Sequence, residues 1–325
     1  QILTSFNLMY NKDNSQLSLY HIYVVTTTDN LSKILARNYS TQYIFTSKLL
    51  NDIIKNNINL SYEVVTLSYK KCPIIFIDIL GTKENSDFET QFKIQTMFHN
   101  ALEKERGMDA NHNYTVYKRF ITTFSDCAYI VYDYKDEIDA HRKDDDRLFL
   151  IALYNTEKLI VEFLKEGFLC RGACTFGEVY YDEKENMLFG PAVNEVYILE
   201  QKKAIYPRII INPNIAEHFT KRNAEIYGSS KVNGNIIKLD KDGISFLHVL
   251  NTYDIGINLY EYESLSKKLN ALSMSTISKC KTNIQNSNDE TYTKSQQKII
   301  EKHEWMLDYL KSIKTSFFKY GDLFN

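Results

Sequence analysis

Glycine and proline are scarce in this 325-residue sequence, with 11 and 4 copies, and there is only one tryptophan. This scarcity excludes collagen-like and low-complexity disordered chains, which need far more of both residues. No apolar run approaches the roughly 20 residues that a membrane-spanning helix requires. The formal net charge is only −2, so no global positive field attracts nucleic acid or anionic lipid, and any phosphate binding must be local.

Cysteine is also sparse and shows no disulfide framework. The five cysteines form no CxxC pair; Cys170 and Cys174 are four residues apart, but no second pair of soft ligands follows nearby. We therefore expect reduced packing thiols in a cytoplasmic protein. The seven histidines are scattered without the spacing of metal ligands. The printed chain begins with Gln, which leaves open a removed or truncated leader, with Met9 as an alternative start.

The remaining composition is typical of a folded globular protein. Hydrophobic residues make up 44% of the chain and charged residues 25%, both ordinary values. The length suits one large domain or two modest ones. We expect three parts: residues 1–70, which carry no motif and have no assigned role, a domain over 71–255 that holds every motif, and a helical tail over 256–325.

Residues 71–255 alternate strand-like and helical segments. Short β-branched runs bounded by turn residues indicate strands, and apolar residues at helical spacing indicate helices. This mixture predicts an α+β fold in which helices cover one sheet. The expected order is strand 73–80, helix 88–105, a hairpin over 117–134 with its tip at Ser125-Asp126, helix 145–166 ended by Gly167, strand 168–181, a helix within 187–204, and strands in 206–212 and 236–250.

The two ends of the chain have weaker patterns. Residues 257–280 and 296–315 show helical periodicity, so we expect a C-terminal helical hairpin that packs on the main domain or forms a dimer contact. The joining stretch 281–297 is polar, and we expect it to be mobile. Near the N-terminus, residues 19–27 are strand-like and residues 47–58 have a helical pattern.

One acid interrupts the apolar run "CPIIFIDILG" at residues 72–81, and it needs an explanation. An unpaired buried carboxylate is costly, so Asp78 requires a partner: a backbone donor, a basic side chain or a metal ion. Asp126 is a second acid within strand-like sequence, at the hairpin tip. If strand 73–80 pairs beside the hairpin, the two carboxylates converge into a site for hard divalent cations. The alternative is two unrelated acids at strand ends.

Two further residues are candidates for binding a ligand. Asn194 lies in "GPAVNEVYILE", near the start of a helix, where its amide reaches a ligand or simply caps the helix. Arg171 lies in the strand "CRGACTFGE", where it serves a phosphate or pairs with an acid such as Glu178. The sequence alone leaves both pairs of alternatives open.

Taken in order, the segments "FIDILG", "FSDC", "RGACTFG" and "GPAVN" resemble motifs of the class III nucleotidyl cyclases. The resemblance spans residues 72–212, and its last motif is the most specific. It implies a ferredoxin-like core with an antiparallel-rich sheet. It also implies a homodimer, because in this family the sites form between two such domains.

The resemblance assigns roles to individual residues. Asp78 and Asp126, with the carbonyl of Ile79, would bind two divalent cations, Mn²⁺ or Mg²⁺. Asn194 would orient the ribose or the reacting phosphate. The triphosphate would lie against the turn after the first strand, formed by Gly81, Thr82 and Lys83. The bound cations would promote attack of the ribose 3′-oxygen on the α-phosphate, with loss of pyrophosphate.

The sequence departs from the family at the position that supplies a transition-state arginine, four residues after Asn194. Here that residue is Ile198. Another cation must substitute if the protein is active, and the candidates are Arg171, Lys202 and Arg208. Without a substitute, the protein would be an inactive nucleotide-binding sensor.

The positions that recognise purines in the family are also changed, to Thr122 and Met187. This combination, with the run over residues 169–211, resembles the pyrimidine (uridylate or cytidylate) cyclases of the Pycsar antiphage system. Those enzymes make cyclic UMP or cyclic CMP to activate an effector protein. A threonine hydroxyl both donates and accepts hydrogen bonds, so Thr122 suits either base, and uridylate cyclase is the favoured reading.

Other readings remain. A purine cyclase would require a different mode of base recognition. A diguanylate cyclase is disfavoured because its Gly-Gly-Asp/Glu-Glu-Phe turn is absent from the hairpin, which reads Phe124-Ser125-Asp126. A two-metal phosphohydrolase would need further ligands, usually histidine.

Overall fold

The computed structural model describes residues 2–11, 17–26, 65–82, 87–111, 114–228, 235–256 and 258–321. The chain divides into two compact units, residues 1–69 and 70–325. The first unit contains an antiparallel sheet with strand order β1-β2-β3. Its strands are β1 (Ile2–Asn11), β2 (Leu17–Thr26) and β3 (Val65–Leu67). The strand expected over 19–27 is confirmed by β2, whereas the helical pattern over 47–58 lies outside the described residues.

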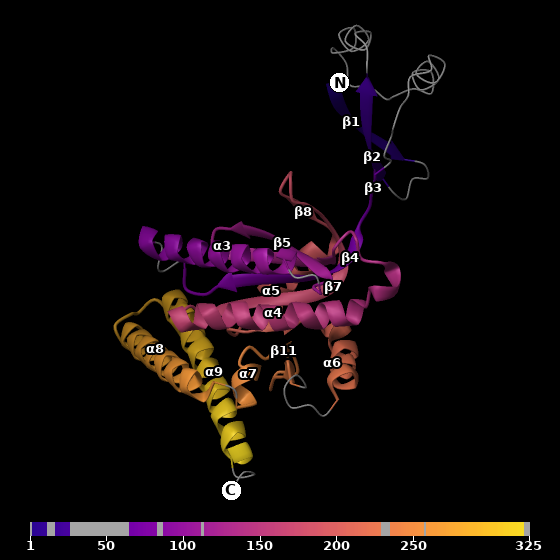
Figure 1. Ribbon diagram of the computed structural model, residues 1–325. Coiled ribbons are helices and arrows are strands. Elements are labelled where there is room, and N and C mark those ends of the chain that lie inside the picture. The colour runs from indigo at the N-terminus through magenta and orange to yellow at the C-terminus, as the bar shows by residue number, and fades with distance from the viewer. Residues whose placement is uncertain are drawn as a thin grey trace. The chain divides into compact units, whose positions relative to one another are not determined.

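The second unit is built on an eight-stranded mixed sheet (Figure 1). Its order is β10-β11-β9-β7-β4-β6-β5, and β8 pairs with β7 beside this path. The neighbours are antiparallel except β7 and β9, which are parallel. The strands are β4 (Lys70–Ile79), β5 (Tyr117–Phe124), β6 (Cys127–Tyr134), β7 (Cys170–Asp182), β8 (Met187–Phe189), β9 (Ile209–Ile211), β10 (Ile237–Leu239) and β11 (Ser245–Leu247).

Within this sheet, β4, β5, β6 and β7 form a ferredoxin-like core with two helices. The chain order is β4, α3 (Phe88–Asn111), β5, β6, α4 (Asp145–Glu166), β7. The spatial order β7-β4-β6-β5 places the first strand between the third and the last, which is the split arrangement of the βαββαβ unit. The predicted α+β class, with a ferredoxin-like core and an antiparallel-rich sheet, is therefore confirmed.

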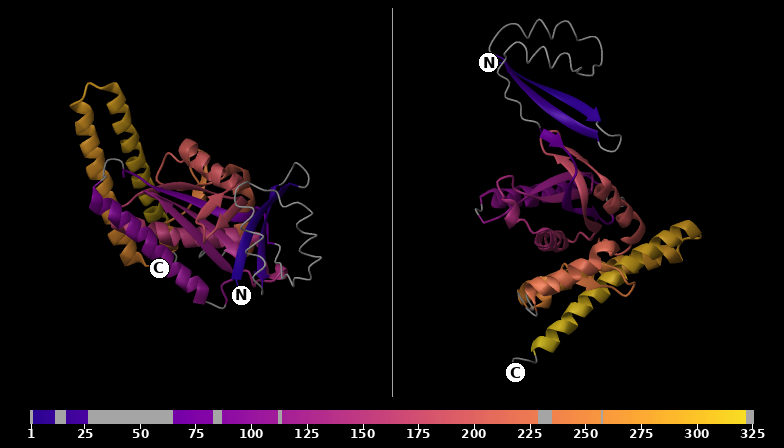
Figure 2. Two further views of the ribbon diagram at one scale, coloured as in Figure 1. Left: turned by 90° about the horizontal axis from the view of Figure 1, so that it is seen from above. Right: turned by 90° about the vertical axis from the view of Figure 1, so that its right-hand side faces the viewer.

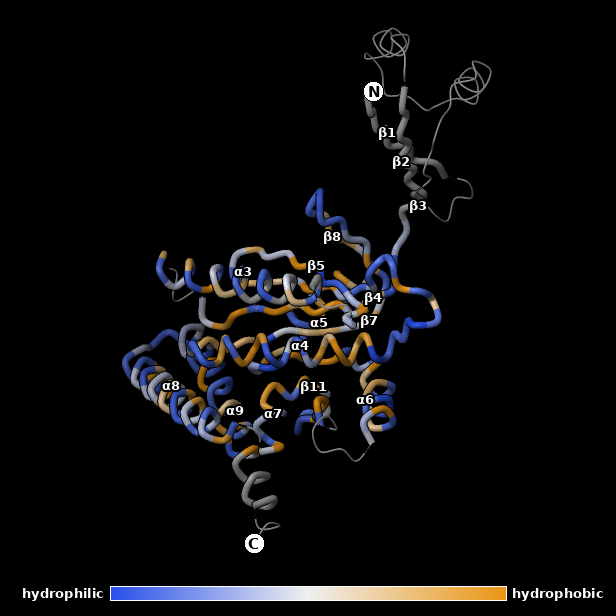
Figure 3. The backbone as a smooth tube through the Cα atoms, viewed as in Figure 1, coloured by the Kyte–Doolittle hydropathy of each residue, from blue (hydrophilic) through white to orange (hydrophobic). Residues whose placement is uncertain are grey.

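Helices lie on both faces of the sheet, and alternation along β4 decides which residues meet them. Ile75, Ile77 and Ile79 join the larger core cluster with residues of α3 and α4. Cys72, Ile74 and Phe76 join a smaller cluster with α5 (Pro191–Lys203). Figure 3 shows hydrophobic colouring concentrated on β4 and along one side of α4.

The limits of helix α4 are set by the residues at its two ends. The Asp144 carboxylate accepts a hydrogen bond from the Arg147 N–H, 3.0 Å away, and caps the N-terminus. Gly167 ends the helix at φ 90°, a conformation that costs glycine little. The expected helix over 145–166 is confirmed. Helix α3 instead runs six residues past the expected end at 105, to Asn111.

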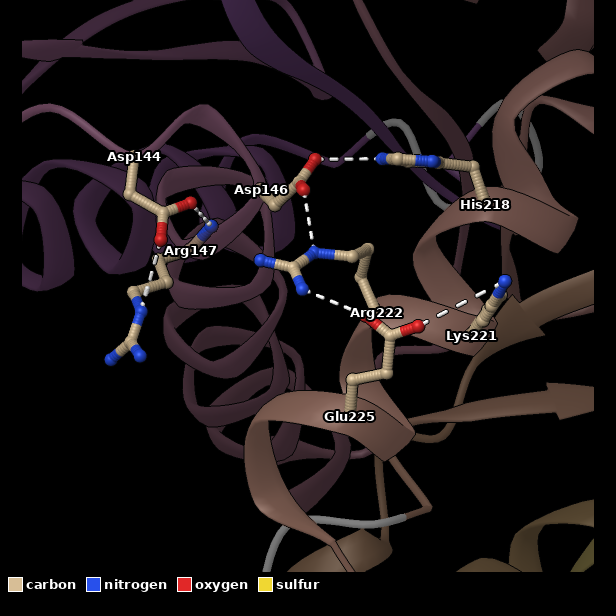
Figure 4. A network of polar contacts seen from close by, with 7 residues as sticks. All are labelled: Asp144, Asp146, Arg147, His218, Lys221, Arg222 and Glu225. Carbon is tan, nitrogen blue, oxygen red and sulfur yellow. Dashed lines mark hydrogen bonds and ion pairs between the residues drawn. The ribbon is translucent and has the colours of Figure 1, made fainter.

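An ion-pair network holds α6 (Pro213–Tyr227) against the first turn of α4 (Figure 4). Asp146 accepts from His218 Nε2 and Arg222 Nε, each at 2.7 Å, and Arg222 also contacts Glu225 at 2.8 Å. Partial burial opposes ionisation of Asp146, but these two hydrogen bonds lower its pKa. The network is a docking contact between helices, on the face of the sheet opposite α5.

The tail forms a long antiparallel helix pair, α8 (Leu259–Gln285) and α9 (Glu290–Gly321), seen in both views of Figure 2. The expected helical hairpin is confirmed, but the expected mobile linker over 281–297 is wrong. Most of that stretch is helical, because Ile284 packs with Ile277 and Ile300 and because Asn283 Nδ2 donates to Gln296 Oε1 at 3.0 Å. None of the described helices is long and apolar enough to cross a membrane.

Arg208 stabilises the packing of α9 against the sheet. Its side chain is 1% exposed and forms ion pairs with Asp240 and Asp242. The guanidinium also lies over the rings of Tyr206 and Trp305, with its central carbon 5.2 and 5.8 Å from their centroids. The Trp305 indole N–H donates to Asp240 at 2.6 Å. This buried clamp joins the segment after α5, the β10–β11 turn and α9.

A second buried polar cluster lies where α9 meets α7 (Asn251–Asp254). His248 is fully buried, with Nδ1 2.6 Å from the Tyr309 hydroxyl and Nε2 3.1 Å from Asp254. Asp254 also pairs with Lys238 at 2.8 Å. Burial lowers the pKa of His248 to about 4, although the hydrogen bond to Asp254 opposes the shift.

We expect stability to fall below neutral pH because of His248. The pKa of a histidine in the unfolded chain is about 6.5, so the folded form is favoured above that value and loses stability as pH falls toward 4. Between pH 7.5 and pH 5 the loss from this group is about 2 kcal/mol. Urea unfolding at both pH values would measure it. A His248→Gln variant should show a shallower pH dependence, and an unchanged slope would contradict the assignment.

Candidate functional site

Asp78 lies at the end of β4, on the face of the sheet that carries α5. It is directly opposite Cys127 on β6 and Arg171 on β7, and residues opposite each other share a face. Its side chain is 20% exposed. The partner that the sequence analysis required is basic, because Arg171 Nε lies 2.9 Å from Asp78 Oδ2.

Asp126 occupies the tip of the β5–β6 hairpin, next to the end of β4. The Ile79 N–H donates to the Asp126 carbonyl oxygen at 3.1 Å. Ser125 turns the chain with φ 55°. The Asp126 carboxylate accepts a hydrogen bond from the Thr82 hydroxyl, and Thr82 is 7% exposed. The hairpin tip is therefore attached to the end of β4 and to the turn after it.

Asp78 and Asp126 both lie beside Cys127, because Asp78 is opposite Cys127 in the β4–β6 pair and Asp126 precedes it in the chain. Burial raises the pKa of Cys127 to about 11, and the charges of Asp78 and then Asp126 add to the increase. The fold thus places both acids beside Cys127, where the end of β4 meets the hairpin tip. Their role as cation ligands, with the Ile79 carbonyl, remains a prediction.

Arg171 connects Asp78 to an acid that the sequence analysis did not identify. Its Nη2 atom lies 2.7 Å from Glu200 Oε1, and the Glu200 side chain is fully buried. Arg171 pairs with Asp78 and Glu200, whereas the suggested partner, Glu178, lies farther along β7 opposite Lys71, so that suggestion is wrong. A signal for Glu200 was present: Ala192, Val196 and Glu200 are the buried residues of α5, at helical spacing, so Glu200 is an acid within an apolar stripe.

Asn194 lies exposed in the first turns of α5. Gly190 is the N-cap of this helix and Pro191 its first residue, a favoured arrangement. The alternative in which Asn194 caps the helix is therefore wrong. Its assignment to the ribose or phosphate remains a prediction.

The two predicted base-recognition residues lie on different strand pairs. Thr122 on β5 is opposite Tyr129 on β6, in the same face as Cys127. Tyr129 packs against Phe76, with ring centroids 4.6 Å apart. Met187 is opposite Asp182 in the β7–β8 pair and is 40% exposed. Thr122 therefore lies beside one aromatic residue of this sheet face, Tyr129, whereas Met187 lies on the separate β7–β8 pair.

The basic side chains considered as substitutes for the missing arginine differ in their exposure and in the partners that they already have. Ile198 is 47% exposed on α5, and Lys202 is exposed near the end of the same helix. Arg208 is held inside the clamp described above, so its proposed catalytic role is wrong. Arg171 is the candidate that contacts one of the two acids. In the turn predicted to bind phosphate, Gly81 has φ 84°, the hydroxyl of Thr82 contacts Asp126, and Lys83 lies outside the described residues.

The donors at this site fit a cation that prefers oxygen. Among the described residues, no group of three or more His, Cys, Asp or Glu side chains is placed to hold a metal ion. Mg²⁺ is commonly bound by one or two carboxylates together with substrate phosphates and water. The pair Asp78 and Asp126 meets that requirement and would not suffice for a closed structural zinc site.

Comparison with known proteins finds similarity among solved structures. No family model matches the chain, and a search of curated proteins also finds no match. Among solved structures, the chain is similar to one titled "Crystal structure of the guanylyl cyclase Cya2". The match has a TM-score of 0.31 and 14% sequence identity, and it covers 56% of this chain and 92% of the other.

Proposed function

We propose that this protein is a nucleotidyl cyclase that converts UTP or CTP to the 3′,5′-cyclic monophosphate and pyrophosphate. One observation supports the proposal above the others: Asp78 is opposite Arg171 and Cys127, and Asp126 precedes Cys127 at the hairpin tip, so the two acids come from adjacent strand ends. A protein that only bound a nucleotide would have no need of two carboxylates at the same point.

The reaction forms a bond between the ribose 3′-oxygen and the α-phosphorus and breaks the bond to the β-phosphate oxygen. When bound, two Mg²⁺ or Mn²⁺ ions would supply Lewis-acid activation and neutralise the triphosphate. Asp78 and Asp126, with the Ile79 carbonyl, would hold them. Asn194 orients the ribose or α-phosphate, and the backbone N–H groups of the turn at Gly81, with Thr82 and Lys83, bind the triphosphate.

Pyrimidine specificity rests on Thr122 and its surroundings. The threonine hydroxyl suits O4 of uracil or N4 of cytosine, because it both accepts and donates. Met187 lacks the polar groups that would read a purine edge. Together with the likeness of residues 169–211 to the antiphage pyrimidine cyclases, this supports a role in bacterial antiviral defence, in which the cyclic nucleotide activates an effector protein.

Product analysis tests this proposal. Purified protein would be incubated with Mn²⁺ and each of ATP, GTP, CTP and UTP, and the products identified by liquid chromatography and mass spectrometry. We expect a cyclic pyrimidine monophosphate and pyrophosphate. Cyclic AMP or cyclic GMP would show that the assignment of Thr122 is wrong while keeping the cyclase activity.

A second candidate is a sensor that binds a nucleotide without turnover. It is favoured by the residues at the positions where a catalytic basic side chain is expected. Ile198 replaces the expected arginine, and Arg208 is consumed by structural ion pairs. Binding of a nucleotide, measured by calorimetry, with no product from any of the four triphosphates would favour the sensor.

We expect a homodimer with shared sites. Phe124 is opposite Cys127, and Tyr197 and Ile198 lie on α5. They are 80%, 49% and 47% exposed, and exposed apolar groups often mark an interface. Light scattering coupled to size-exclusion chromatography should give twice the chain mass. Replacing Ile198 with lysine should shift the protein toward monomer and reduce turnover. A strictly monomeric and fully active protein would contradict the shared-site arrangement.

A further inference from the structure

Three charged side chains form a continuous row from the protein interior to the candidate site. Glu200 is fully buried, and the Arg171 and Asp78 side chains are 23% and 20% exposed. Arg171 contacts Asp78 through Nε at 2.9 Å and Glu200 through Nη2 at 2.7 Å. Because different nitrogen atoms make the two contacts, one contact can be lost while the other remains.

Each member of the row is held by a different element. Asp78 belongs to β4, Arg171 to the paired position on β7, and Glu200 to the buried side of α5. The second carboxylate oxygen of Glu200 accepts a hydrogen bond from Gln201 Nε2 at 2.7 Å, which fixes the orientation of the carboxylate. The inner end of the row is therefore buried and hydrogen-bonded, whereas its outer end is partly exposed.

The charges of the inner pair, Glu200 and Arg171, indicate the role of Glu200. Burial raises the pKa of Glu200, and the positive charge of Arg171 opposes that shift. A buried carboxylate at this position is costly unless it is paired, and a simple salt bridge between Arg171 and Asp78 would not require it. Glu200 provides a second anion for the same guanidinium.

We propose that Arg171 is the internal counter-ion of Asp78 in the cation-free protein, and that Glu200 is a positioning residue that retains Arg171 when a divalent cation takes Asp78. This inference rests on the proposed function. A cation that binds Asp78 must displace the positive charge of Arg171, and Glu200 lowers the cost by keeping that charge compensated. The retained guanidinium then stays beside the cation, where its planar donors suit a phosphate.

The proposal predicts opposite effects on Mn²⁺ affinity from two variants, one single and one double. In Glu200→Gln, Arg171 is compensated by Asp78 alone, so Mn²⁺ should bind about tenfold more weakly. In the double variant Arg171→Met/Glu200→Gln the competing cation is gone, and the fully buried carboxylate of Glu200 is replaced by a neutral amide. Mn²⁺ should then bind about tenfold more tightly than to the wild type. A purely structural row would alter stability without this change of sign.

The test is a titration of the metal-free full-length chain with Mn²⁺ in the absence of nucleotide, with free Mn²⁺ measured by electron paramagnetic resonance. Glu225→Gln is the matched control, because it removes a carboxylate that pairs with an arginine on α6, at 2.8 Å, on the other face of the sheet. It should leave the affinity unchanged. Equal affinities for the wild type and both row variants would overturn the inference and leave the proposed function standing.

A measurement on the wild type covers the case in which a variant does not fold. Titration with Mg²⁺, followed by NMR of the arginine Nε–H signals, should shift the Arg171 signal as its contact with Asp78 is lost. An unshifted signal at saturating Mg²⁺ would overturn the inference. If neither Mn²⁺ nor Mg²⁺ binds, and Asp78→Asn behaves like the wild type, both the inference and the proposed cation site are overturned.

Discussion

Replacing Asp78 or Asp126 with asparagine is expected to reduce cyclase turnover by about a thousandfold or more, while the protein stays folded. The asparagine amide is uncharged and is a poor ligand for Mg²⁺ or Mn²⁺. Its oxygen still accepts the hydrogen bonds that Arg171 and Thr82 donate to the two carboxylates. Pyrophosphate release would measure turnover, and circular dichroism would show whether the fold is kept.

The matched control for these variants is Asp136→Asn. Asp136 also pairs with a cation, Lys118, at 2.8 Å, but its side chain is 84% exposed. The control removes the same charge from a surface position and should leave turnover unchanged. Full activity in either site variant would refute the role of the two carboxylates as cation ligands.

The largest effect on stability is expected from Arg208→Met. This substitution leaves Asp240 and Asp242 without their buried cation, and the loss of one partner of a buried ion pair typically costs about 3–5 kcal/mol. It also removes the guanidinium from the rings of Tyr206 and Trp305. The free energy of unfolding in urea should fall by that amount.

The only tryptophan of the chain is Trp305, so its fluorescence reports directly on this clamp. In Arg208→Met we expect an altered emission spectrum in the folded state as well as a lower urea midpoint. Arg222→Met serves as a control, because Arg222 forms two ion pairs but is 32% exposed. A loss of stability from Arg208→Met no larger than that from the control would contradict the structural role of the clamp.

The sequence predicted the elements whose limits depend on adjacent residues. Helix α4 begins at an aspartate cap and ends at a glycine, and the β5–β6 hairpin turns at Ser125-Asp126. In both elements, the conformational preferences of the local sequence agree with the tertiary packing. The many polar residues of the stretch 281–297 indicate a mobile linker, whereas Ile284 within it packs with Ile277 of its own helix and with Ile300 of the next helix.

The candidate site could be predicted from the sequence only in part, because an acid in an apolar segment is easier to detect in a strand than in a helix. Asp78 was identified because an acid within an apolar strand is conspicuous, and Asp126 because it occupies a turn. Glu200 was overlooked although it occupies the buried stripe of α5 in the same way. The pattern of a helix spreads the stripe over every fourth residue, so an acid within it is less visible than an acid within a continuous apolar strand.

The sequence by itself determined the order of helices and strands, the positions of the turns and the two acids that interrupt apolar segments, because these depend on local preference and spacing. Only the tertiary structure decided which charges meet. Arg171 faces Asp78 because of the β4–β7 register and reaches Glu200 because α5 packs on that face. Arg208, one of three cations considered for the chemistry, instead became a structural clamp, because the β10–β11 turn brings two aspartates to it.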